Sequence, residues 1–228
     1  MMKVWCLVIL VLLPLSLFQI SYGNAYEEKQ ILLKALKLKG DIQRGALIYE
    51  EACEACHYEN AVGDPAGTFP QLAGQHENVI IKQMAEIAGG FRVNFTMLPY
   101  STTKALVSST EDLFKHPLTS TQALADIAAY LASLPISINT TKGPGKSLDK
   151  GKNLFESRCS KCHGVNGKGK AVASIPALAG QNYNYLMRQI DVYNKGSRKK
   201  ANPVMLRLMK GLKKVELGPV MDYLSRMK

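Results

Sequence analysis

The chain has 228 residues and a net charge of +11, from 29 Lys and Arg against 18 Asp and Glu. This charge is uneven, because residues 26–139 carry nine basic and thirteen acidic side chains (−4), whereas residues 140–228 carry nineteen and five (+14). Such an asymmetry bears on binding partners and not on the fold. The chain shows no sustained alternation of apolar and polar residues, which excludes a protein built from β-sheets and favours helices joined by loops.

The first 25 residues have the pattern of an export signal. Lys3 precedes an apolar run over residues 4–18, and small residues follow at Gly23-Asn24-Ala25. We expect cleavage after Ala25 and a periplasmic location. The alternative is a retained membrane anchor, although the run falls short of the ~18 apolar residues of a spanning helix. Cleavage also removes Cys6 and leaves four cysteines.

The next segment, residues 27–39, is predicted to be an amphipathic helix. Ile31, Leu32 and Leu36 are its apolar positions, and Lys34 and Lys37 are charged. We expect this helix to pack on the domain that follows it.

A Cys-x-x-Cys-His string then occurs twice, at residues 53–57 and 159–163. This spacing attaches c-type haem covalently, because two thiols reach the two vinyl groups of a porphyrin while the His binds the iron. A thioredoxin-like dithiol needs a βαβ context that is absent, and the two pairs are too far apart for a zinc ribbon. The sequence therefore predicts two covalently bound haem c groups. Their attachment residues are Cys53, Cys56, Cys159 and Cys162, and the iron ligands are His57 and His163.

The surroundings of the two motifs repeat at a constant distance of 106 residues. The matched pairs are Gly45 and Gly151, Pro70 and Pro176, Leu72 and Leu178, Gly74 and Gly180, Gln83 and Gln189, and Arg92 and Arg198. Two copies at this distance indicate a duplicated domain. We place a first domain at residues 26–139, with the N-terminal helical extension, and a second at 140–228.

Each repeat is predicted to begin and end with a helix. These are residues 41–52 and 122–134 in the first repeat, and 149–158 and 215–227 in the second. Gly45 and Gly151 lie inside the leading helices, where a Gly costs ~1 kcal/mol relative to Ala, so we expect a packing reason for each. Residues 135–146 read as a linker with little capacity to bury anything.

The strings FPQLAGQ (residues 69–75) and IPALAGQ (residues 175–181), each downstream of a haem motif, resemble the dihaem cytochromes c of the c-four type. The resemblance covers nearly everything after residue 40. It implies an all-α fold of two tandem class I cytochrome c domains, each wrapped around one haem, in which the first and last helices cross at the small residue. Tyr58 stands where the family usually has Gly, so we expect the turn after His57 to be built differently.

A Met in each domain is the sixth iron ligand that the resemblance implies. In the second domain this is Met205, with Met209 one helical turn later as an alternative. In the first domain it is Met97, which lies five residues after Arg92, whereas Met205 lies seven after Arg198. The segment after Met97 is fifteen residues longer than its counterpart.

That longer segment contains His116, a rival ligand of the first haem, and an open position on the first iron is the third alternative. Pro70 and Pro176 resemble the family's proline whose carbonyl accepts the N–H of the ligating imidazole, or else they are simple turn prolines. Arg92 and Arg198 either pair with haem propionates or face solvent.

The predicted function is electron carriage and not catalysis, because an iron with both axial positions filled has no place for a substrate. The resemblance implies single-electron transfer from a quinol-oxidising complex or dehydrogenase to a terminal oxidase or reductase. One alternative is a haem enzyme or ligand sensor that uses an open position on the first iron. Another is a dedicated cytochrome subunit of one dehydrogenase.

The charge asymmetry predicts how the chain meets its partners. The basic second domain is expected to dock on the acidic surface of a redox protein, or peripherally on an anionic membrane face. Lys161, Lys168 and Lys170 are the candidate contacts, with residues 198–200 nearby in sequence. The alternative is an ordinary solvated charge run. A nucleic-acid partner is not expected for an exported haem protein.

Overall fold

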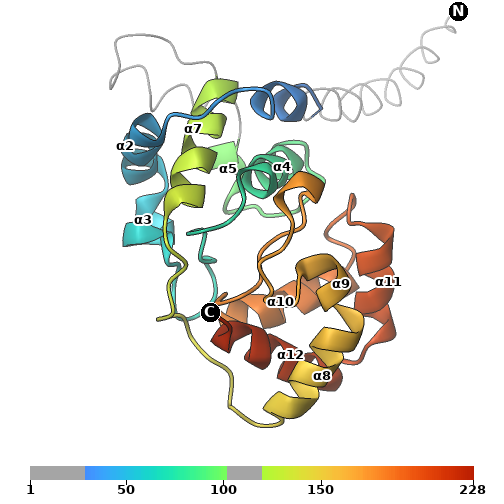
Figure 1. Cartoon of the computed structure of the whole chain (residues 1–228). Coiled ribbons are helices and arrows are strands. Elements are labelled where there is room, and N and C mark those ends of the chain that lie inside the picture. The colour runs from blue at the N-terminus through green and yellow to red at the C-terminus, as the bar shows by residue number, and fades with distance from the viewer. Residues whose placement is uncertain (1–28, 102–119) are drawn as a thin grey trace, which may run out of the picture.

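The computed structural model describes residues 29–101 and 120–228. These residues are helical and contain no strand, as predicted for the all-α class, and Figure 1 shows them as two stacked lobes that correspond to the two repeats. None of the helices among them is long and apolar enough to cross a membrane. The export segment at residues 1–25 lies outside the described residues.

The two lobes contain their elements in the same order, although η1 and η2 do not lie at matching positions. The first has α2 (Ile42–Ala52), α3 (Glu54–His57), η1 (Glu59–Ala61), α4 (Glu77–Ala88), α5 (Leu98–Ser101) and α7 (Ser120–Ser133). The second has α8 (Leu148–Arg158), α9 (Ser160–His163), η2 (Ala171–Ala173), α10 (Tyr183–Asn194), α11 (Pro203–Gly211) and α12 (Lys214–Arg226). Helix α2 begins where the Asp41 carboxylate accepts the Arg44 N–H at 3.0 Å, which satisfies one of the N–H groups left open at a helix start.

The first and last helices of each lobe cross at the predicted glycines. A Cβ on Gly45 would lie 2.0 Å from the Asp126 carbonyl oxygen on α7, and one on Gly151 would lie 2.1 Å from that of Pro219 on α12. The helix backbones therefore touch, which is the packing reason for a Gly inside each helix. Aromatic pairs flank both crossings, with ring centroids 5.5 Å apart for Tyr49 and Tyr130, and 5.9 Å apart for Phe155 and Tyr223.

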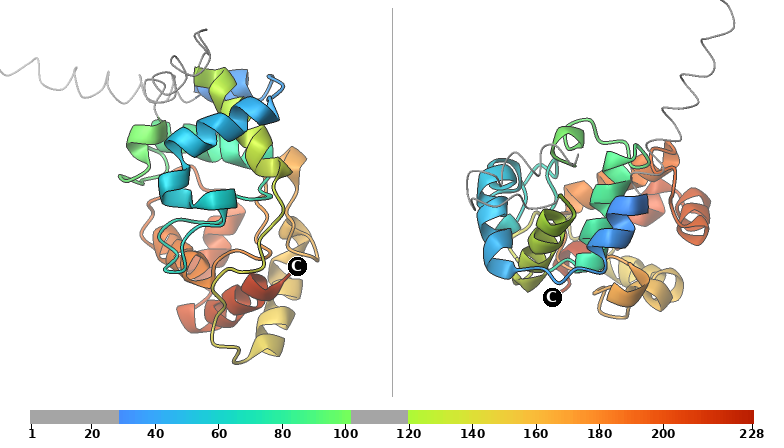
Figure 2. Two further views of the ribbon diagram at one scale, coloured as in Figure 1. Left: turned by 90° about the vertical axis from the view of Figure 1, so that its left-hand side faces the viewer. Right: turned by 90° about the horizontal axis from the view of Figure 1, so that it is seen from above.

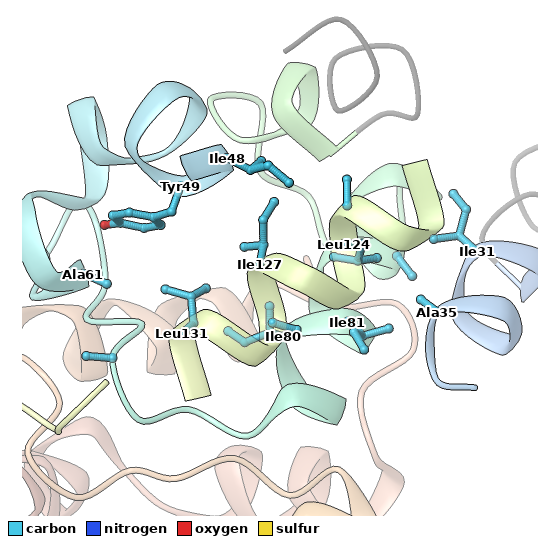
Figure 3. Close-up of a cluster of buried hydrophobic side chains, with 14 residues drawn as sticks. Ile31, Ala35, Ile48, Tyr49, Ala61, Ile80, Ile81, Leu124, Ile127 and Leu131 are labelled. Carbon is cyan, nitrogen blue, oxygen red and sulfur yellow. The ribbon is translucent and has the colours of Figure 1, made fainter. Parts of the chain in front are cut away.

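The first domain has a continuous core that includes the N-terminal helical segment. Residues 29–35 are helical, and Ile31 and Ala35 are buried in the same cluster as Leu124 and Ile81, as Figure 3 shows. The expectation that this segment packs on the first domain is confirmed. The second domain has its own core around Phe155, built from α8, α10, α11 and α12.

The two domains contact each other through segments that are also related by the 106-residue distance. The Val93 N–H donates to Ser197 O at 3.0 Å, and the Lys199 N–H donates to Phe91 O at 2.8 Å, which is the same contact made twice in opposite directions. Asn78 Nδ2 donates to Ala171 O at 3.2 Å, and the matching Asn184 Nδ2 donates to Pro65 O at 3.1 Å. The domains therefore pack about an approximate two-fold relation, as two copies of one surface do in a symmetric dimer.

The linker at residues 135–146 buries more than predicted. Figures 1 and 2 show it passing from the end of α7, beside the C-terminus, to the start of α8. The Ser137 N–H donates to Gln71 Oε1 at 2.8 Å, and the buried Thr140 Oγ1 donates to Gly180 O at 2.7 Å. The prediction of a loose linker is wrong, because the segment runs along the domain interface and its polar groups pair with both domains.

Candidate haem sites

Each attachment motif forms a single helical turn at the end of a longer helix. Cys53 ends α2, and the His57 N–H donates to Cys53 O at 2.9 Å. Cys159 ends α8 in the same way, and the His163 N–H donates to its carbonyl at 3.0 Å. Cys53 and Cys159 each pack against the core of their own domain. The motif residues are therefore held by the helix that crosses at Gly45 or Gly151.

The two motif histidines are buried and share one orientation. His57 is 6% exposed with Nδ1 3.1 Å from Pro70 O, and His163 is 7% exposed with Nδ1 3.0 Å from Pro176 O. A carbonyl only accepts, so Nδ1 carries the proton and the lone pair lies on Nε2, where a metal binds.

The environment of both histidines also favours the neutral imidazole that a metal requires. Burial holds the pKa of His57 below its usual value, and the bond to Pro70 and the charge of Asp64 oppose this more weakly. Burial lowers the pKa of His163 likewise, against the weaker effect of its bond to Pro176. Both imidazoles are therefore available as ligands near neutral pH.

The first residue of the turn after each histidine has the same conformation in both domains. Tyr58 has φ 65° and ψ 164°, and Gly164 at the matching position has φ 79° and ψ 152°. The next hydrogen bonds also match, since the Gly63 N–H donates to His57 O at 2.9 Å and the Gly169 N–H to His163 O at 2.7 Å. Tyr58 therefore takes the conformation of the matching glycine, but the turn differs two residues later, where Asn60 has a positive φ of 57° and the matching Asn166 does not. The prediction of a differently built turn is thus wrong at Tyr58 and confirmed at Asn60.

The cost of this conformation is compensated locally. A non-glycine residue in this region of φ and ψ costs ~1–3 kcal/mol. The Tyr49 hydroxyl donates to Tyr58 O at 2.7 Å, whereas the second domain has Phe155 at the position of Tyr49 and Gly164 in the turn. The hydroxyl of Tyr49 is therefore present only in the domain whose turn is strained, where it stabilises the turn by a hydrogen bond.

Met97 and Met205 occupy equivalent local positions although they are 108 residues apart. The Met97 N–H donates to Asn94 Oδ1 at 3.2 Å, and the Met205 N–H to Asn202 Oδ1 at 3.4 Å, so each Met is the third residue after an Asn whose side chain accepts its N–H. Met205 lies in the first turn of α11, and Met97 directly precedes α5. Both methionines are partly buried. Met209 is instead buried within the second core, and His116 lies outside the described residues.

The matched arginines are held at the domain interface and each retains an unpaired nitrogen. Arg92 is 8% exposed, and its Nη2 donates to Tyr185 OH at 2.8 Å while Nη1 has no partner. Arg198 Nη1 donates to Tyr193 OH at 3.1 Å while Nε has no partner. A buried N–H without an acceptor is costly, and a propionate oxygen is an acceptor that suits guanidinium. These orphaned groups fit a haem in both domains and favour the propionate role over solvent exposure.

Sequence reasoning missed two sets of interface residues. Tyr185 reaches Arg92 from the other domain, and its counterpart is Val79, so the repeat gave no signal for it. Gln75 and Gln181 cross the interface to the segments that follow Pro176 and Pro70. Here a signal existed, because both glutamines end the repeated LAGQ string.

Comparisons with known proteins agree with this geometry. The Cytochrome c family model matches residues 42–135 and 148–228. Cytochrome c4 of Pseudomonas aeruginosa is 34% identical over 152 residues, covering 64% of this chain and 68% of the relative. A thiosulfate dehydrogenase electron acceptor of Stutzerimonas stutzeri is 32% identical over 188 residues, covering 80% and 82%. The solved structure of reduced recombinant cytochrome c4 from Pseudomonas stutzeri matches with a TM-score of 0.65 at 26% identity, covering 83% of this chain and 100% of that one.

Proposed function

Since the chain belongs to the cytochrome c family and is a dihaem member of the cytochrome c4 type, we propose that His57 and Met97 ligate its first haem iron, and His163 and Met205 its second. The chain carries two covalent haem c groups and functions in electron transfer. The observation that carries the ligand proposal is the bond from each histidine Nδ1 to a proline carbonyl, which leaves Nε2 for the iron in both domains. The haem supplies the one-electron redox change, and the chain supplies its ligands, burial and surface charge.

The side chains around each haem have distinct proposed roles. The four motif cysteines hold the porphyrin covalently, and Pro70 and Pro176 fix the tautomer of the ligating histidines. Met97 and Met205 contribute a weak thioether donor, which raises the potential relative to a second histidine. Arg92 and Arg198 bind propionates through their unpaired nitrogens. With both axial positions filled, the chain is a carrier and not an enzyme.

The proposed partners are redox proteins of an exported compartment. One relative is named as the electron acceptor of thiosulfate dehydrogenase, which supports a dehydrogenase as donor here, with a terminal oxidase or reductase as acceptor. We place the mature chain in the periplasm after cleavage near Ala25, with the domain boundary between residues 139 and 140.

The proposed docking surface is the basic face beside the second haem motif. Lys161, Lys168 and Lys170 are exposed there. Within residues 198–200, Lys200 Nζ lies 3.8 Å from the centroid of the Phe91 ring of the first domain, and Lys199 is exposed. The three lysines near the motif, with Lys199 beside them in sequence, are the proposed contacts for an acidic partner or, peripherally, an anionic membrane.

The first test is the state of the iron in the purified holoprotein. Mass spectrometry is expected to find two haem increments on the mature chain and no thiol of the two motifs open to alkylation. Met205→Ala should turn only the second haem high-spin, and Met97→Ala only the first, because each removes one weak axial donor.

Met209→Leu is the control, because this core residue is expected to leave both haem spectra unchanged. An unchanged first haem in Met97→Ala together with a disturbed one in His116→Ala would transfer the ligand role to His116. A wild-type first haem that is already high-spin would support the ligand-sensor alternative.

A further inference from the structure

Gln75 and Gln181 each bind a backbone segment of the opposite domain with both ends of the amide. Gln181 Oε1 accepts the Gln71 N–H at 3.1 Å, and its Nε2 donates to Gln71 O at 2.9 Å. Gln75 Oε1 accepts the Ala177 N–H at 3.0 Å, and its Nε2 donates to Ala177 O at 3.1 Å. Both the glutamines and their targets are 106 residues apart, so this is one contact made twice across the approximate two-fold relation.

The N–H that each glutamine binds belongs to the same peptide group as the proline carbonyl that accepts from the histidine. In the first domain the peptide between Pro70 and Gln71 is bonded to Gln181 on one side and to His57 Nδ1, at 3.1 Å, on the other. In the second domain the peptide after Pro176 is bonded to Gln75 and, at 3.0 Å, to His163 Nδ1. A single amide thus separates each glutamine from the histidine of the opposite domain.

This arrangement links the glutamine to the electron density on the imidazole. An amide whose N–H donates a hydrogen bond becomes a stronger acceptor at its carbonyl, because chains of hydrogen bonds polarise one another. A stronger acceptor at Nδ1–H raises the basicity of a ligating histidine. A more basic ligand stabilises ferric iron and lowers the redox potential.

We propose that Gln75 and Gln181 are positioning residues, each of which lowers the redox potential of the haem in the opposite domain. The proposal rests on the ligand roles proposed for His57 and His163. Gln181 and Gln71 are 8% and 5% exposed, whereas the contact between Gln75 and Ala177 is only partly buried. A hydrogen bond is stronger away from water, so the effect on the first haem is the larger one.

The test measures the potential of each haem in the intact holoprotein with Gln181→Met and Gln75→Met. These variants keep the side-chain length and remove both hydrogen bonds across the interface, together with the local bond that each Oε1 accepts from the N–H of the next residue. The haems are distinguished by their ferric methyl resonances, assigned from the Met97→Ala and Met205→Ala variants. In Gln181→Met the first haem is expected to become more easily reduced. At a fixed potential its ratio of oxidised to reduced form should fall at least ~threefold, which corresponds to a rise of ~30 mV in its redox potential at 59 mV per tenfold. In Gln75→Met the second haem should shift in the same direction by less, and in each variant the other haem should not move.

Asn184→Ala and Asn78→Ala are the matched controls. Each removes one hydrogen bond across the same interface, to Pro65 O or Ala171 O, without touching the peptide bonded to a histidine. These variants are expected to lower the melting temperature without a crossed shift in potential. The same crossed shift in the controls would mean that domain packing in general sets the potentials, and would overturn the proposal.

Gln181→Glu gives a test of sign that also serves if Gln181→Met folds poorly. A carboxylate at this position keeps an acceptor for the Gln71 N–H and is a stronger acceptor than an amide. The potential of the first haem should therefore fall relative to the wild type, and by more than that of the second haem. An equal shift of both haems, or an easier reduction of the first, would overturn the proposal. If the ligand assignment itself is wrong, the ferric spectrum of the wild-type protein will lack the signature of His/Met ligation. This result is independent of the glutamine variants.

Discussion

Replacing Gly151 by Ala is expected to destabilise the second domain by about 2 kcal/mol. The new Cβ would lie 2.1 Å from Pro219 O, and real contacts of this kind are essentially never under 3.0 Å, so α8 and α12 must separate by nearly 1 Å. Overpacking of this kind costs up to ~3 kcal/mol. The better helix propensity of Ala offsets ~1 kcal/mol of this, so the free energy of unfolding should fall by ~2 kcal/mol. At ~4–8 °C per kcal/mol for a domain of this size, the midpoint of thermal unfolding should fall by ~8–16 °C.

The assay is thermal unfolding of the holoprotein followed by far-UV circular dichroism, with Gly211→Ala as the control. Gly211 ends α11 in the same domain, and a Cβ there would meet nothing within 4 Å. This control is expected to be neutral or stabilising by up to ~1 kcal/mol. If Gly151→Ala melts at or above the wild-type temperature while the control behaves as expected, the argument that backbone contact requires Gly at the crossing is refuted.

Two further predictions concern the strained turn and the docking face. Tyr49→Phe should cost about 1 kcal/mol in a denaturant titration, because the carbonyl of Tyr58 loses its 2.7 Å hydrogen bond; an unchanged midpoint would show that this bond does not support the turn. Lys161→Glu combined with Lys168→Glu should slow association with an acidic redox partner by about tenfold at low salt and flatten the salt dependence, without changing the transfer rate within the complex. The assay is stopped-flow kinetics over a salt series, in which the reversal Glu50→Lys on the first domain should not slow association.

The identity of the cofactor and the duplication followed from the sequence because both depend on local order. Covalent attachment needs both thiols and the imidazole of each motif within five residues, so the motif at Cys53 is complete without any knowledge of the fold. The 106-residue repeat and the buried glycines are likewise patterns along the chain. Gly45 and Gly151 lower the stability of their helices relative to Ala, and a close contact between helices offsets this loss. The helix crossing could therefore be anticipated from the sequence.

The tertiary structure decided every feature that depends on the contact between the domains. The backbone at Tyr58 was mispredicted, because this residue adopts the conformation of the matching Gly164 although the local preference of tyrosine opposes it. The linker around Thr140 was mispredicted for a related reason: its composition indicates flexibility, but its position along the interface supplies partners for its polar groups. Arg92 pairs with Tyr185, whose counterpart in the first repeat is the apolar Val79, so a comparison of the two repeats could not reveal this bond. A sequence determines which groups a chain carries, and only the packing of its two halves determines that Gln181 reaches the peptide next to His57.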